Sequence, residues 1–160
     1  MSELKWKIRL VNGDVERFMP LLLEADPSRE LVERYLAQGE LWACEDDSGP
    51  AGVALVMPVG GDAVELMNLC TREDLRGQGL GHALVEHIKR HYAGRFSELR
   101  VGTADGFDKT QRFYEHCGFS FTHMDRGFFV RNYSEPVYDG DKQCIDMARY
   151  ALKLSAPVRT

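Results

Sequence analysis

The sequence lacks the features that mark several large classes of protein. Its longest apolar run, residues 51–59, is far shorter than the roughly 20 residues of a membrane-spanning helix. It has no repeat period and no low-complexity tract, which excludes solenoids and fibrous arrays. Its first residues are polar and contain no apolar core of a signal peptide. We therefore expect a cytoplasmic protein that does not bind a membrane.

Cysteine is scarce, and its placement argues against disulfides and metal sites. The four cysteines, at positions 44, 70, 117 and 144, are far apart, and none belongs to a C-x-x-C pair. Each has apolar neighbours, which predicts buried free thiols in a reducing compartment. His87 and His91 lie four residues apart on an expected helix, but no H-E-x-x-H pattern includes them, so a solvated helix face is the simpler interpretation. We expect no metal site.

Positive charge is in the minority. The chain has 20 Lys and Arg against 25 Asp and Glu, a net charge of −5, which is the wrong sign for a dedicated nucleic-acid binder. The acidic balance weakly favours cationic partners such as amines, whereas the locally basic segment 76–112 is the best place for an anionic ligand. The 160 residues, 44% of them hydrophobic, suit one globular domain, which we place at 1–160 with its core at about 5–154.

What the chain does contain is a regular succession of apolar patterns. Alternating patterns predict strands, and patterns of helical period predict helices. The expected strands are 5–10, 41–45, 51–57, 63–70, 99–102, 119–124 and 145–154, and the expected helices are 18–25, 28–39, 80–92 and 108–117. Asp108 and Gln111 resemble a capping box that opens the last helix, and Gly118 fits its left-handed C-cap. This order predicts an α/β or α+β sheet with a parallel step in its middle.

The sharpest local signal is a glycine-rich turn, Arg76-Gly77-Gln78-Gly79-Leu80-Gly81, between an apolar strand and an amphipathic helix. Glycines allow positive φ angles, and a helix start supplies unpaired N–H groups, so the turn suits a pyrophosphate-sized anion. Arg76 adds a fixed positive charge. A dinucleotide fingerprint is excluded because its third glycine is replaced by His82, and a P-loop is excluded because no lysine follows the glycines. The alternative is that the glycines serve only the tight packing of a helix start.

The turn and a second motif together resemble a known family. R-x-x-G-x-G at 76–81 resembles the acetyl-coenzyme A (acetyl-CoA) motif of the GNAT superfamily of N-acetyltransferases, and 113–119 resembles that family's aromatic-Tyr-x-x-x-Gly-Phe helix end. The resemblance implies a mixed, mostly antiparallel central sheet with a parallel step at the cofactor cleft, flanked by about four helices. It also implies acetyl-CoA as the cosubstrate. The segment 128–136 is similar to a bacterial subgroup, a similarity that names no acceptor.

The resemblance further implies which residues hold the cofactor. The main chain of Leu69, Cys70 and Thr71 would pair with the pantetheine arm, and its free N–H groups could serve as an oxyanion hole. Where family members often carry a cofactor-contacting asparagine, this chain offers Asp105 or Asp108. The full set of expected cofactor-binding residues is Leu69, Cys70, Thr71, Arg76, Gly77, Gln78, Gly79, Leu80, Gly81, His82, Asp105 and Tyr114.

Acetyl transfer to an amine requires a base, donors for an oxyanion and an acid for the departing thiolate. The resemblance makes Tyr114 the candidate acid, and the alternative is a core residue of a short helix. Glu65 lies inside the apolar strand 63–70, where desolvation raises the pKa of a carboxylate unless a cation holds it, so it is the candidate base. The alternative is a buried ion pair with an arginine such as Arg100. His123 is a further candidate base, and Cys70 is better explained as a structural thiol than as an acyl-cysteine.

The segment 125–141 combines aromatic and acidic residues. Aromatic walls with carboxylates suit a protonated amine through cation–π contact and charge pairing, and the alternative is an ordinary aromatic hairpin with solvated acids. The residues concerned are Phe128, Phe129, Tyr133, Tyr138, Asp125, Glu135, Asp139 and Asp141.

Three functions follow from these features. We expect an N-acetyltransferase that moves the acetyl group of acetyl-CoA to a primary amine of a small molecule or peptide by direct attack in a ternary complex. The alternatives are a catalytically silent acyl-CoA-binding regulatory protein on the same fold and a nucleotide-binding module. The presence of Tyr114 distinguishes the enzyme from the silent regulatory protein. Thermal stabilisation of the protein by CoA, but not by ATP or NAD, would distinguish both from a nucleotide-binding module. The resemblance also raises the expectation of a homodimer, and we expect no nucleic-acid partner.

Overall fold

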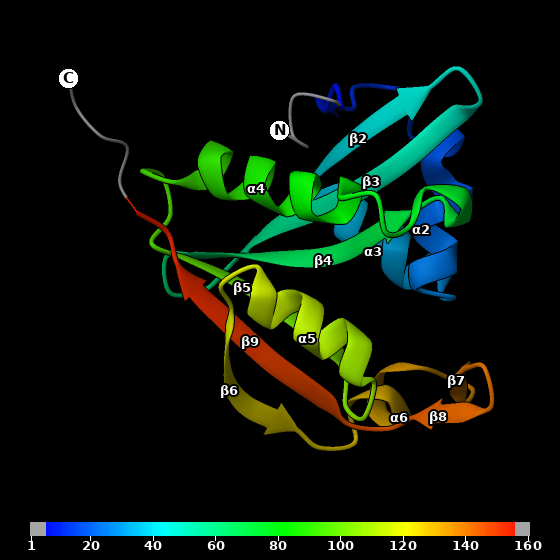
Figure 1. Ribbon diagram of the computed structural model, residues 1–160. Helices are drawn as coiled ribbons and strands as arrows, with labels where there is room; N and C mark the ends of the chain where they lie inside the picture. Colours follow the sequence, from blue (N-terminus) through cyan, green and yellow to red (C-terminus); the bar gives the residue numbers. More distant parts are fainter. Residues whose placement is uncertain (1–5, 156–160) are drawn as a thin grey trace.

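The structure is a computed structural model that describes residues 6–155 (Figure 1). Within these residues, a seven-stranded sheet has the order β1-β2-β3-β4-β5-β9-β6, and a second sheet joins β7 and β8. The strands are β1 (Arg9–Leu10), β2 (Glu40–Asp46), β3 (Gly49–Val59), β4 (Ala63–Thr71), β5 (Glu98–Ala104), β6 (Ser120–Asp125), β7 (Val137–Asp139), β8 (Lys142–Cys144) and β9 (Met147–Lys153). The helices are η1 (Val15–Phe18), α2 (Met19–Ala25), α3 (Arg29–Gln38), η2 (Glu73–Leu75), α4 (Leu80–Tyr92), α5 (Asp108–His116) and α6 (Phe128–Asn132).

The large sheet contains the expected parallel step. Its neighbouring strands pair antiparallel except β4 and β5, which run parallel. Pairing of β4 with β5 extends from Ala63 opposite Glu98 to Leu66 opposite Val101, and the strands then diverge, as Figure 1 shows. We call the diverging parts, residues 67–71 of β4 and 102–104 of β5, the fork. Main-chain groups that face each other across the fork do not pair with each other, so they are available to a ligand.

A β-bulge lies where the fork begins. Leu55 of β3 pairs with Asn68, but the next residue, Val56, pairs with Leu66, so Met67 is the extra residue of β4. The extra residue reverses which face the following side chains occupy. Residues 64 and 66 pack on the α4 side of the sheet, whereas Asn68 and Cys70 face α2.

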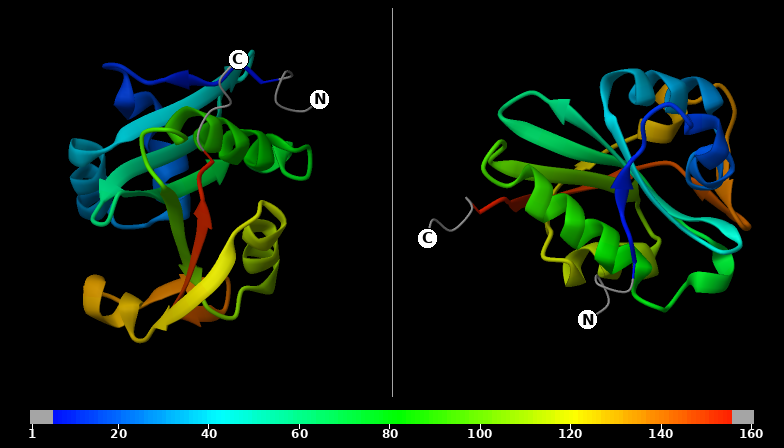
Figure 2. Two further views of the ribbon diagram at one scale, coloured as in Figure 1. Left: turned by 90° about the vertical axis from the view of Figure 1, so that its left-hand side faces the viewer. Right: turned by 90° about the horizontal axis from the view of Figure 1, so that it is seen from above.

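Helices cover both faces of the sheet. α2 packs on β3 and β4 and α3 packs on β3, while α4 packs on the same two strands from the other side. Figure 2 shows α2, α3 and α6 on one side of the sheet and α4 and α5 on the other. Each face has its own hydrophobic cluster: Leu84 and Ile88 of α4 belong to one, and Phe18 and Leu22 belong to the other.

Local sequence explains where several elements begin and end. The Ser28 hydroxyl accepts a hydrogen bond from the Leu31 N–H at 3.2 Å and so caps α3. A side chain at Gly39 would collide with the Val56 carbonyl oxygen, so α3 ends at a glycine that lets the chain enter β2. Gly118 has φ +105° and ends α5, with the Phe119 N–H donating to the Tyr114 oxygen at 3.0 Å. The predicted helices and the hairpin of β2 and β3 are thereby confirmed.

Several expectations were wrong in detail. Of the expected strand 5–10, only Arg9–Leu10 is a strand, and position 5 lies outside the described residues. Asp108 does not cap α5: the N-cap is Phe107, and Gln111 reaches back to the Gly106 N–H at 3.1 Å. Asp108 is the first residue inside the helix and follows the N-cap, so its side chain is not in the position that caps a helix.

The segment between β6 and β9 also differs from expectation. We call residues 126–146 the insert; it contains α6, β7 and β8, none of which was predicted. These elements are only three to five residues long, too short for a periodic pattern to stand out. Lys142 donates to the Gly106 oxygen and lies 5.0 Å from the centre of the Phe107 ring, so the insert is attached to the loop before α5. None of the helices in residues 6–155 is long and apolar enough to span a membrane.

Candidate active site

The end of β4 leads through η2 into the glycine-rich turn and α4. Gly77 and Gly79 have φ angles of +81° and +90°, in the left-handed region that favours glycine. Gly79 is the N-cap of α4, and the first helical hydrogen bond runs from the Ala83 N–H to its oxygen at 2.9 Å. The N–H groups of residues 79–82 therefore have no acceptor within the helix. Together with the positive end of the helix dipole, they form a donor array suited to an anion.

The glycines of the turn have different roles. A Cβ atom on Gly77 would meet nothing within 4 Å, so this glycine is required by its φ angle and has open space in front of it. A Cβ atom on Gly81 would lie 3.3 Å from the Cζ atom of Phe113, so this glycine lets α4 approach α5. The packing interpretation therefore applies to Gly81, whereas Gly77 and Gly79 fit an anion site.

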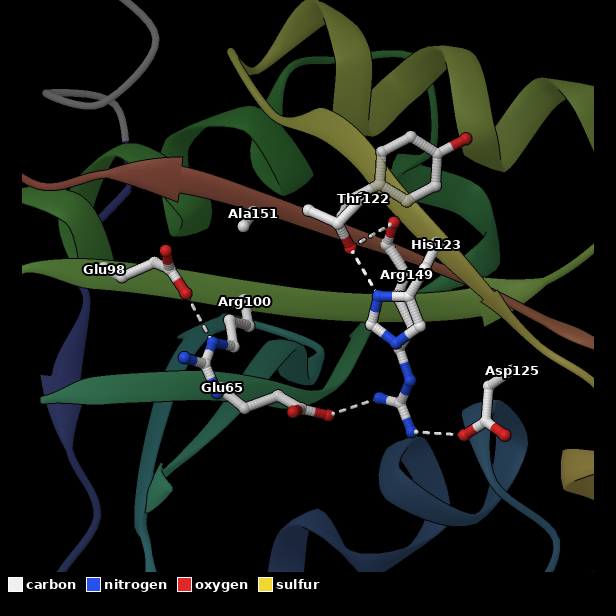
Figure 3. A pocket seen from close by; sticks show the side chains of 9 residues that line it. Glu65, Glu98, Arg100, Thr122, His123, Asp125, Arg149 and Ala151 are labelled. Carbon is white, nitrogen blue, oxygen red and sulfur yellow. Dashed lines mark hydrogen bonds and ion pairs between the residues drawn. The ribbon is translucent and has the colours of Figure 1, made fainter. Parts of the chain in front are cut away.

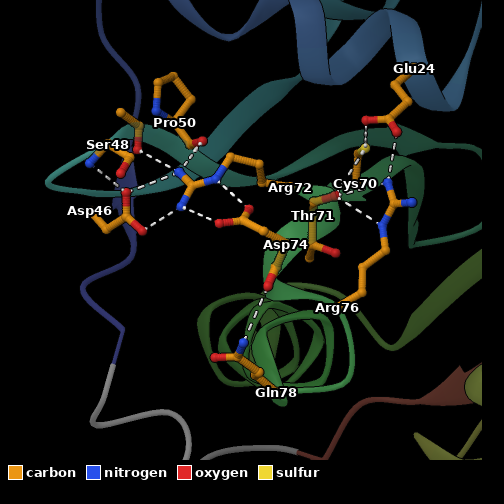
Figure 4. A network of polar contacts seen from close by, with 11 residues as sticks. Glu24, Asp46, Ser48, Pro50, Cys70, Thr71, Arg72, Asp74, Arg76 and Gln78 are labelled. Carbon is orange, nitrogen blue, oxygen red and sulfur yellow. Dashed lines mark hydrogen bonds and ion pairs between the residues drawn. The ribbon is translucent and has the colours of Figure 1, made fainter.

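Arg76 does not extend over the turn. Its guanidinium lies 2.8 Å from the Glu24 carboxylate of α2 and donates to the Thr71 oxygen at 3.0 Å (Figure 4). The side chain thus ties the end of β4 to α2. A phosphate contact by this guanidinium would require the ion pair to open, so the main-chain donors are the better supported part of the anion site.

Arg72, which the sequence did not single out, holds the start of the turn. Its guanidinium lies 2.6 Å from Asp46 and 2.7 Å from Asp74, and it keeps the pKa of both carboxyl groups below their ordinary values (Figure 4). The Gln78 amide donates to the Asp74 oxygen at 3.3 Å. These contacts fix the turn to the hairpin of β2 and β3.

The three residues expected to face the pantetheine arm lie on the β4 side of the fork. Leu69 packs against the cluster on the α4 side, whereas Cys70 faces α2, with its sulfur 3.5 Å from the Glu24 carboxylate. Burial raises the pKa of the Cys70 thiol to about 12, so it is not a nucleophile at neutral pH. All four cysteines are free and buried, which confirms the predicted structural thiols.

Tyr114 lies on α5, on the same side of the sheet as the turn. It is buried, and its ring contacts Phe113 at 5.2 Å and Phe119 at 5.6 Å between centres. Burial raises the pKa of its hydroxyl well above the ordinary value, so the group is a proton donor at neutral pH. The core role and the acid role do not exclude each other at this position.

The remaining expected cofactor residues lie near the starts of α4 and α5. His82 stands in the first turn of α4, and its Nδ1 atom lies 3.8 Å from the Cys117 sulfur. Asp105 is half-buried and pairs through its N–H with the Asp146 oxygen at 2.9 Å, whereas Asp108 is exposed in the first turn of α5. Of the two aspartates, only Asp105 is held against the rest of the fold by a hydrogen bond that the structure shows.

Glu65 is engaged in an ion pair, but not with Arg100. Its carboxylate lies 3.0 Å from the guanidinium of Arg149 of β9, while Arg100 pairs with Glu98 (Figure 3). Arg149 reaches β4 by crossing β5 at Gly102, where a Cβ atom would lie 2.9 Å from its guanidinium. The ion-pair alternative for Glu65 is therefore correct, but its partner is Arg149 and not the suggested Arg100, although Arg100 lies opposite Glu65 in the register of β4 and β5.

Arg149 also binds Asp125 of β6 at 3.3 Å, so one guanidinium joins three strands (Figure 3). Although burial opposes it, hydrogen bonds from Arg131 and Arg149 hold the pKa of Asp125 below its ordinary value. Glu65, Asp125 and Arg149 are among the residues that line a pocket of about 540 Å³. His123 also lines it, is exposed and contacts the Thr122 hydroxyl at 3.0 Å.

The insert places one of its aromatic residues against a carboxyl group that the sequence did not single out. The Tyr133 side chain is near enough to Asp26, which follows α2, to lower the pKa of its carboxyl group, and the Tyr133 ring stacks on Phe129 at 5.6 Å between centres. Burial raises the pKa of the Asp26 carboxyl above its ordinary value. Of the other residues expected on the acceptor side, Tyr138 is exposed, as are Glu135, Asp139 and Asp141.

Sequence reasoning treated the region around Asp26 only as a break between two helices. The signal that could have found it is an acidic residue directly after an apolar helix that packs on the β4 strand. Asn68 was missed for a similar reason, since a single polar residue in an apolar strand carries no motif.

The solvated helix face expected for His87 and His91 is wrong for His87, which is half-buried, whereas His91 is exposed, and the rings of both pack on Trp42. The His87 and His91 rings lie 4.8 and 4.5 Å from the Trp42 ring. Within residues 6–155, no group of three or more His, Cys, Asp or Glu side chains is arranged to hold a metal ion.

Comparisons with known proteins agree with this geometry. Residues 37–121 match the model of an acetyltransferase (GNAT) domain. A relative described as the uncharacterized N-acetyltransferase YvbK of Bacillus subtilis is 31% identical, over 96% of this chain and 100% of its own length.

Solved structures give the same result. A GNAT family acetyltransferase from Elizabethkingia anophelis, with acetyl-CoA bound, has a TM-score of 0.87 and 27% identity over 93% of this chain and 98% of its own. A Bacillus subtilis acetyltransferase in complex with CoA has a TM-score of 0.84 and 31% identity over 93% of this chain and 99% of its own.

Proposed function

Since this chain belongs to the GNAT family of acetyltransferases, we propose that it transfers the acetyl group of acetyl-CoA to a primary amine of a small molecule or peptide. The reaction we propose is direct attack of the amine within a ternary complex, carried out by one domain that spans residues 1–160. Family and mixed fold agree with the sequence expectation.

The observation that carries the proposal is the donor array at residues 79–82, beside the unpaired main chain of the fork. The fit of these residues to CoA can be judged from the structure itself. The positive φ angles of Gly77 and Gly79 turn the chain into the start of α4, where the N–H groups of residues 79–82 are free of helical acceptors. The open space beside Gly77 leaves room for a diphosphate. Residues 69–71 would hold the pantetheine arm as an added strand. When bound there, acetyl-CoA supplies an acetyl thioester that is activated for attack by an amine.

The chain's own residues perform three tasks in this proposal. The main chain at the bulge of β4 offers N–H groups to the oxyanion that forms during attack. Tyr114, which burial keeps protonated, donates its proton to the departing sulfur. The turn and α4 orient the thioester toward the fork.

Glu65 fits a positioning role better than that of a base. The Glu65 carboxylate lies 3.0 Å from the Arg149 guanidinium, so it is already engaged in an ion pair. Its contact with Arg149 instead joins β4 to β9 just before the strands diverge, which fixes the geometry of the fork. We propose that the amine loses its proton to solvent before attack.

The test of the proposal combines binding with turnover. Isothermal titration calorimetry with CoA, ATP and NAD should show binding of CoA alone, accompanied by a rise in melting temperature. A screen of amines, polyamines, amino acids and antibiotics should then show thiol release from acetyl-CoA with at least one acceptor. CoA binding without thiol release from any acceptor would favour the regulatory protein, and binding of ATP or NAD in place of CoA would refute the proposal.

A further inference from the structure

Arg72 stands at the junction between the sheet and the glycine-rich turn. The pairing of β3 with β4 ends with Gly52 opposite Thr71, and the Arg72 N–H then donates to the Ala51 oxygen at 2.8 Å. The next residues form η2, which leads into the turn. The Arg72 side chain is half-buried beside the end of the hairpin of β2 and β3. Whatever holds this residue therefore also holds the point from which the turn starts.

All three nitrogen atoms of the Arg72 guanidinium donate hydrogen bonds (Figure 4). Nη1 and Nη2 donate to the two oxygens of the Asp46 carboxylate at 2.9 and 2.6 Å, which is a bidentate arrangement. Nη1 also donates to the Pro50 oxygen at 3.1 Å, and Nε donates to the Asp74 carboxylate at 2.7 Å. Because Asp46 and Pro50 belong to the hairpin and Asp74 belongs to η2, one side chain joins the two.

Hydrogen bonds among the following residues connect this contact to the donor array. The Leu75 N–H donates to the Arg72 oxygen at 2.9 Å, and the Gln78 N–H donates to the Leu75 oxygen at 3.3 Å. The Gln78 side-chain amide donates to the Asp74 oxygen at 3.3 Å. Gly79 follows directly and is the N-cap of α4. The position of the N–H groups at the start of α4 therefore depends on where Arg72 is held.

Asp46, the bidentate partner, is itself held by the hairpin. Its carboxylate accepts a hydrogen bond from the Ser48 N–H at 2.9 Å, and Asp46 pairs with Gly49 at the end of the hairpin. The strand β3 pairs with β2 on one side and with β4 on the other. The hairpin thus gives the guanidinium a fixed support on the sheet.

Charge alone does not account for this arrangement. Arg72 keeps the pKa of the Asp46 and Asp74 carboxyl groups below their ordinary values, so both are ionised at neutral pH. Two carboxylates more than cancel the one positive charge, so the cluster as a whole does not attract an anion. The planar guanidinium instead fixes the distance between two segments of the chain.

We propose that Arg72 is a positioning residue for the cosubstrate. It fixes the glycine-rich turn to the hairpin, and the affinity for CoA depends on this attachment through the main-chain donors at 79–82. This inference rests on the proposed function, because it concerns the CoA site. It assigns the role to a residue outside the R-x-x-G-x-G motif, whose own arginine, Arg76, is tied to α2.

The first test compares Arg72→Met with the wild-type protein in calorimetric titrations with CoA. Methionine keeps an unbranched apolar stem and removes every donor, so the turn loses its attachment. The Kd for CoA should rise about tenfold, the loss expected for hydrogen bonds to charged groups. With acetyl-CoA and the best acceptor from the screen, the KM for acetyl-CoA should rise by a similar factor, while kcat at saturation stays within about a factor of two.

Asp46→Ala separates positioning from charge. On charge alone, loss of a carboxylate near the turn would tighten the binding of an anionic ligand. Loss of the attachment should instead weaken CoA binding by about threefold or more. Arg72→Lys keeps the positive charge but cannot engage Asp46 and Asp74 as a planar fork, so its Kd should lie between those of the wild-type protein and Arg72→Met.

Arg29→Met is the matched control. Arg29 also bridges two carboxylates, Glu16 at 2.6 Å and Glu33 at 3.2 Å, but it lies on α3. The Kd of this variant for CoA should equal that of the wild-type protein. An unchanged Kd in Arg72→Met, an unchanged or lower Kd in Asp46→Ala, or an equal rise in Arg29→Met would overturn the inference.

Melting curves of each variant check that the fold is kept. If Arg72→Met does not fold, Asp46→Ala decides the question, because it removes the same attachment from the hairpin side. Failure of the wild-type protein to bind CoA would instead overturn the proposed function.

Discussion

The two faces of β4 offer opposite chemistry. On the α4 side, the strand leads into a turn whose N–H groups at 79–82 have no acceptor within the helix. On the α2 side, the same strand presents the Asn68 amide, which donates to the Leu22 oxygen of α2, and the buried Cys70 thiol. One face therefore leaves main-chain donors open to a ligand, whereas the other is closed by contacts between β4 and α2.

The bulge at Met67 makes this difference possible. Without the extra residue, Asn68 and Cys70 would continue the series of Val64 and Leu66 and would face α4. With it, they face α2, and the polar amide meets the end of that helix. A single inserted residue thus decides which side chains each face of β4 presents.

The largest expected effect lies on the donor face. Gly79→Val should weaken CoA binding by about 100-fold or more, because a β-branched residue resists the φ angle of +90° that gathers the N–H groups. Calorimetric titration with CoA measures it. Gly13→Val is the matched control, since Gly13 has φ +99° with no atom near its missing Cβ, and it lies far along the chain from the turn. Equal loss of CoA affinity in both variants would show that strain alone, rather than the donor array, is responsible.

The second expected effect lies between the two faces, at the transfer step. Tyr114→Phe should lower kcat by about 100-fold while leaving CoA affinity within a factor of two, because it removes the hydroxyl and keeps the buried ring. Steady-state kinetics with the best acceptor from the screen checks this. Tyr92→Phe, at another buried tyrosine on α4, should leave kcat unchanged. Unaltered kcat in Tyr114→Phe would remove this residue as the acid and leave it a core residue.

The smallest expected effect concerns the burial of the Asp26 carboxyl group on the α2 face. Burial raises the pKa of Asp26 in the folded protein, so its protonated form favours folding, and this stability is lost as the pH rises through the folded-state pKa. Asp26→Asn does not titrate and should melt about 2–4 °C higher at neutral pH, the shift that 1 kcal/mol gives in a domain of this size. The difference should shrink as the pH falls below the ordinary pKa of aspartate. Melting curves across that pH range measure it, and a variant that melts lower at neutral pH would contradict the unpaired charge.

The parts that sequence predicted well are local in the chain. The apolar stripe of α4, the left-handed Gly118 and the glycines of the turn were found because helical period and positive φ leave direct traces in adjacent residues. The resemblance assigned Tyr114 and the turn to one cofactor site, and the structure places both on the α4 side of the sheet. Their position in the structure agrees with that expectation, and their roles in binding and catalysis stay predictions.

The parts that sequence did not predict depend on contacts between distant residues. Glu65 was matched with Arg100 on strand order, but Arg149 reaches it from 84 positions away because Gly102 leaves a path across β5. Asp26 and Asn68 meet through one oxygen although Leu22 and Asn68 are 46 positions apart. No periodic pattern or motif spans such separations.

By itself, the sequence determined the longer helices and strands, the glycine-rich turn and the family resemblance, because each depends on φ angles and apolar spacing within a few residues. Only the tertiary structure decided which carboxylates meet arginines, which face Asn68 occupies and which buried side-chain oxygen has no donor within residues 6–155. The physical reason is that burial and pairing belong to packed neighbours, and a chain acquires those neighbours only when its sheet and helices close on one another.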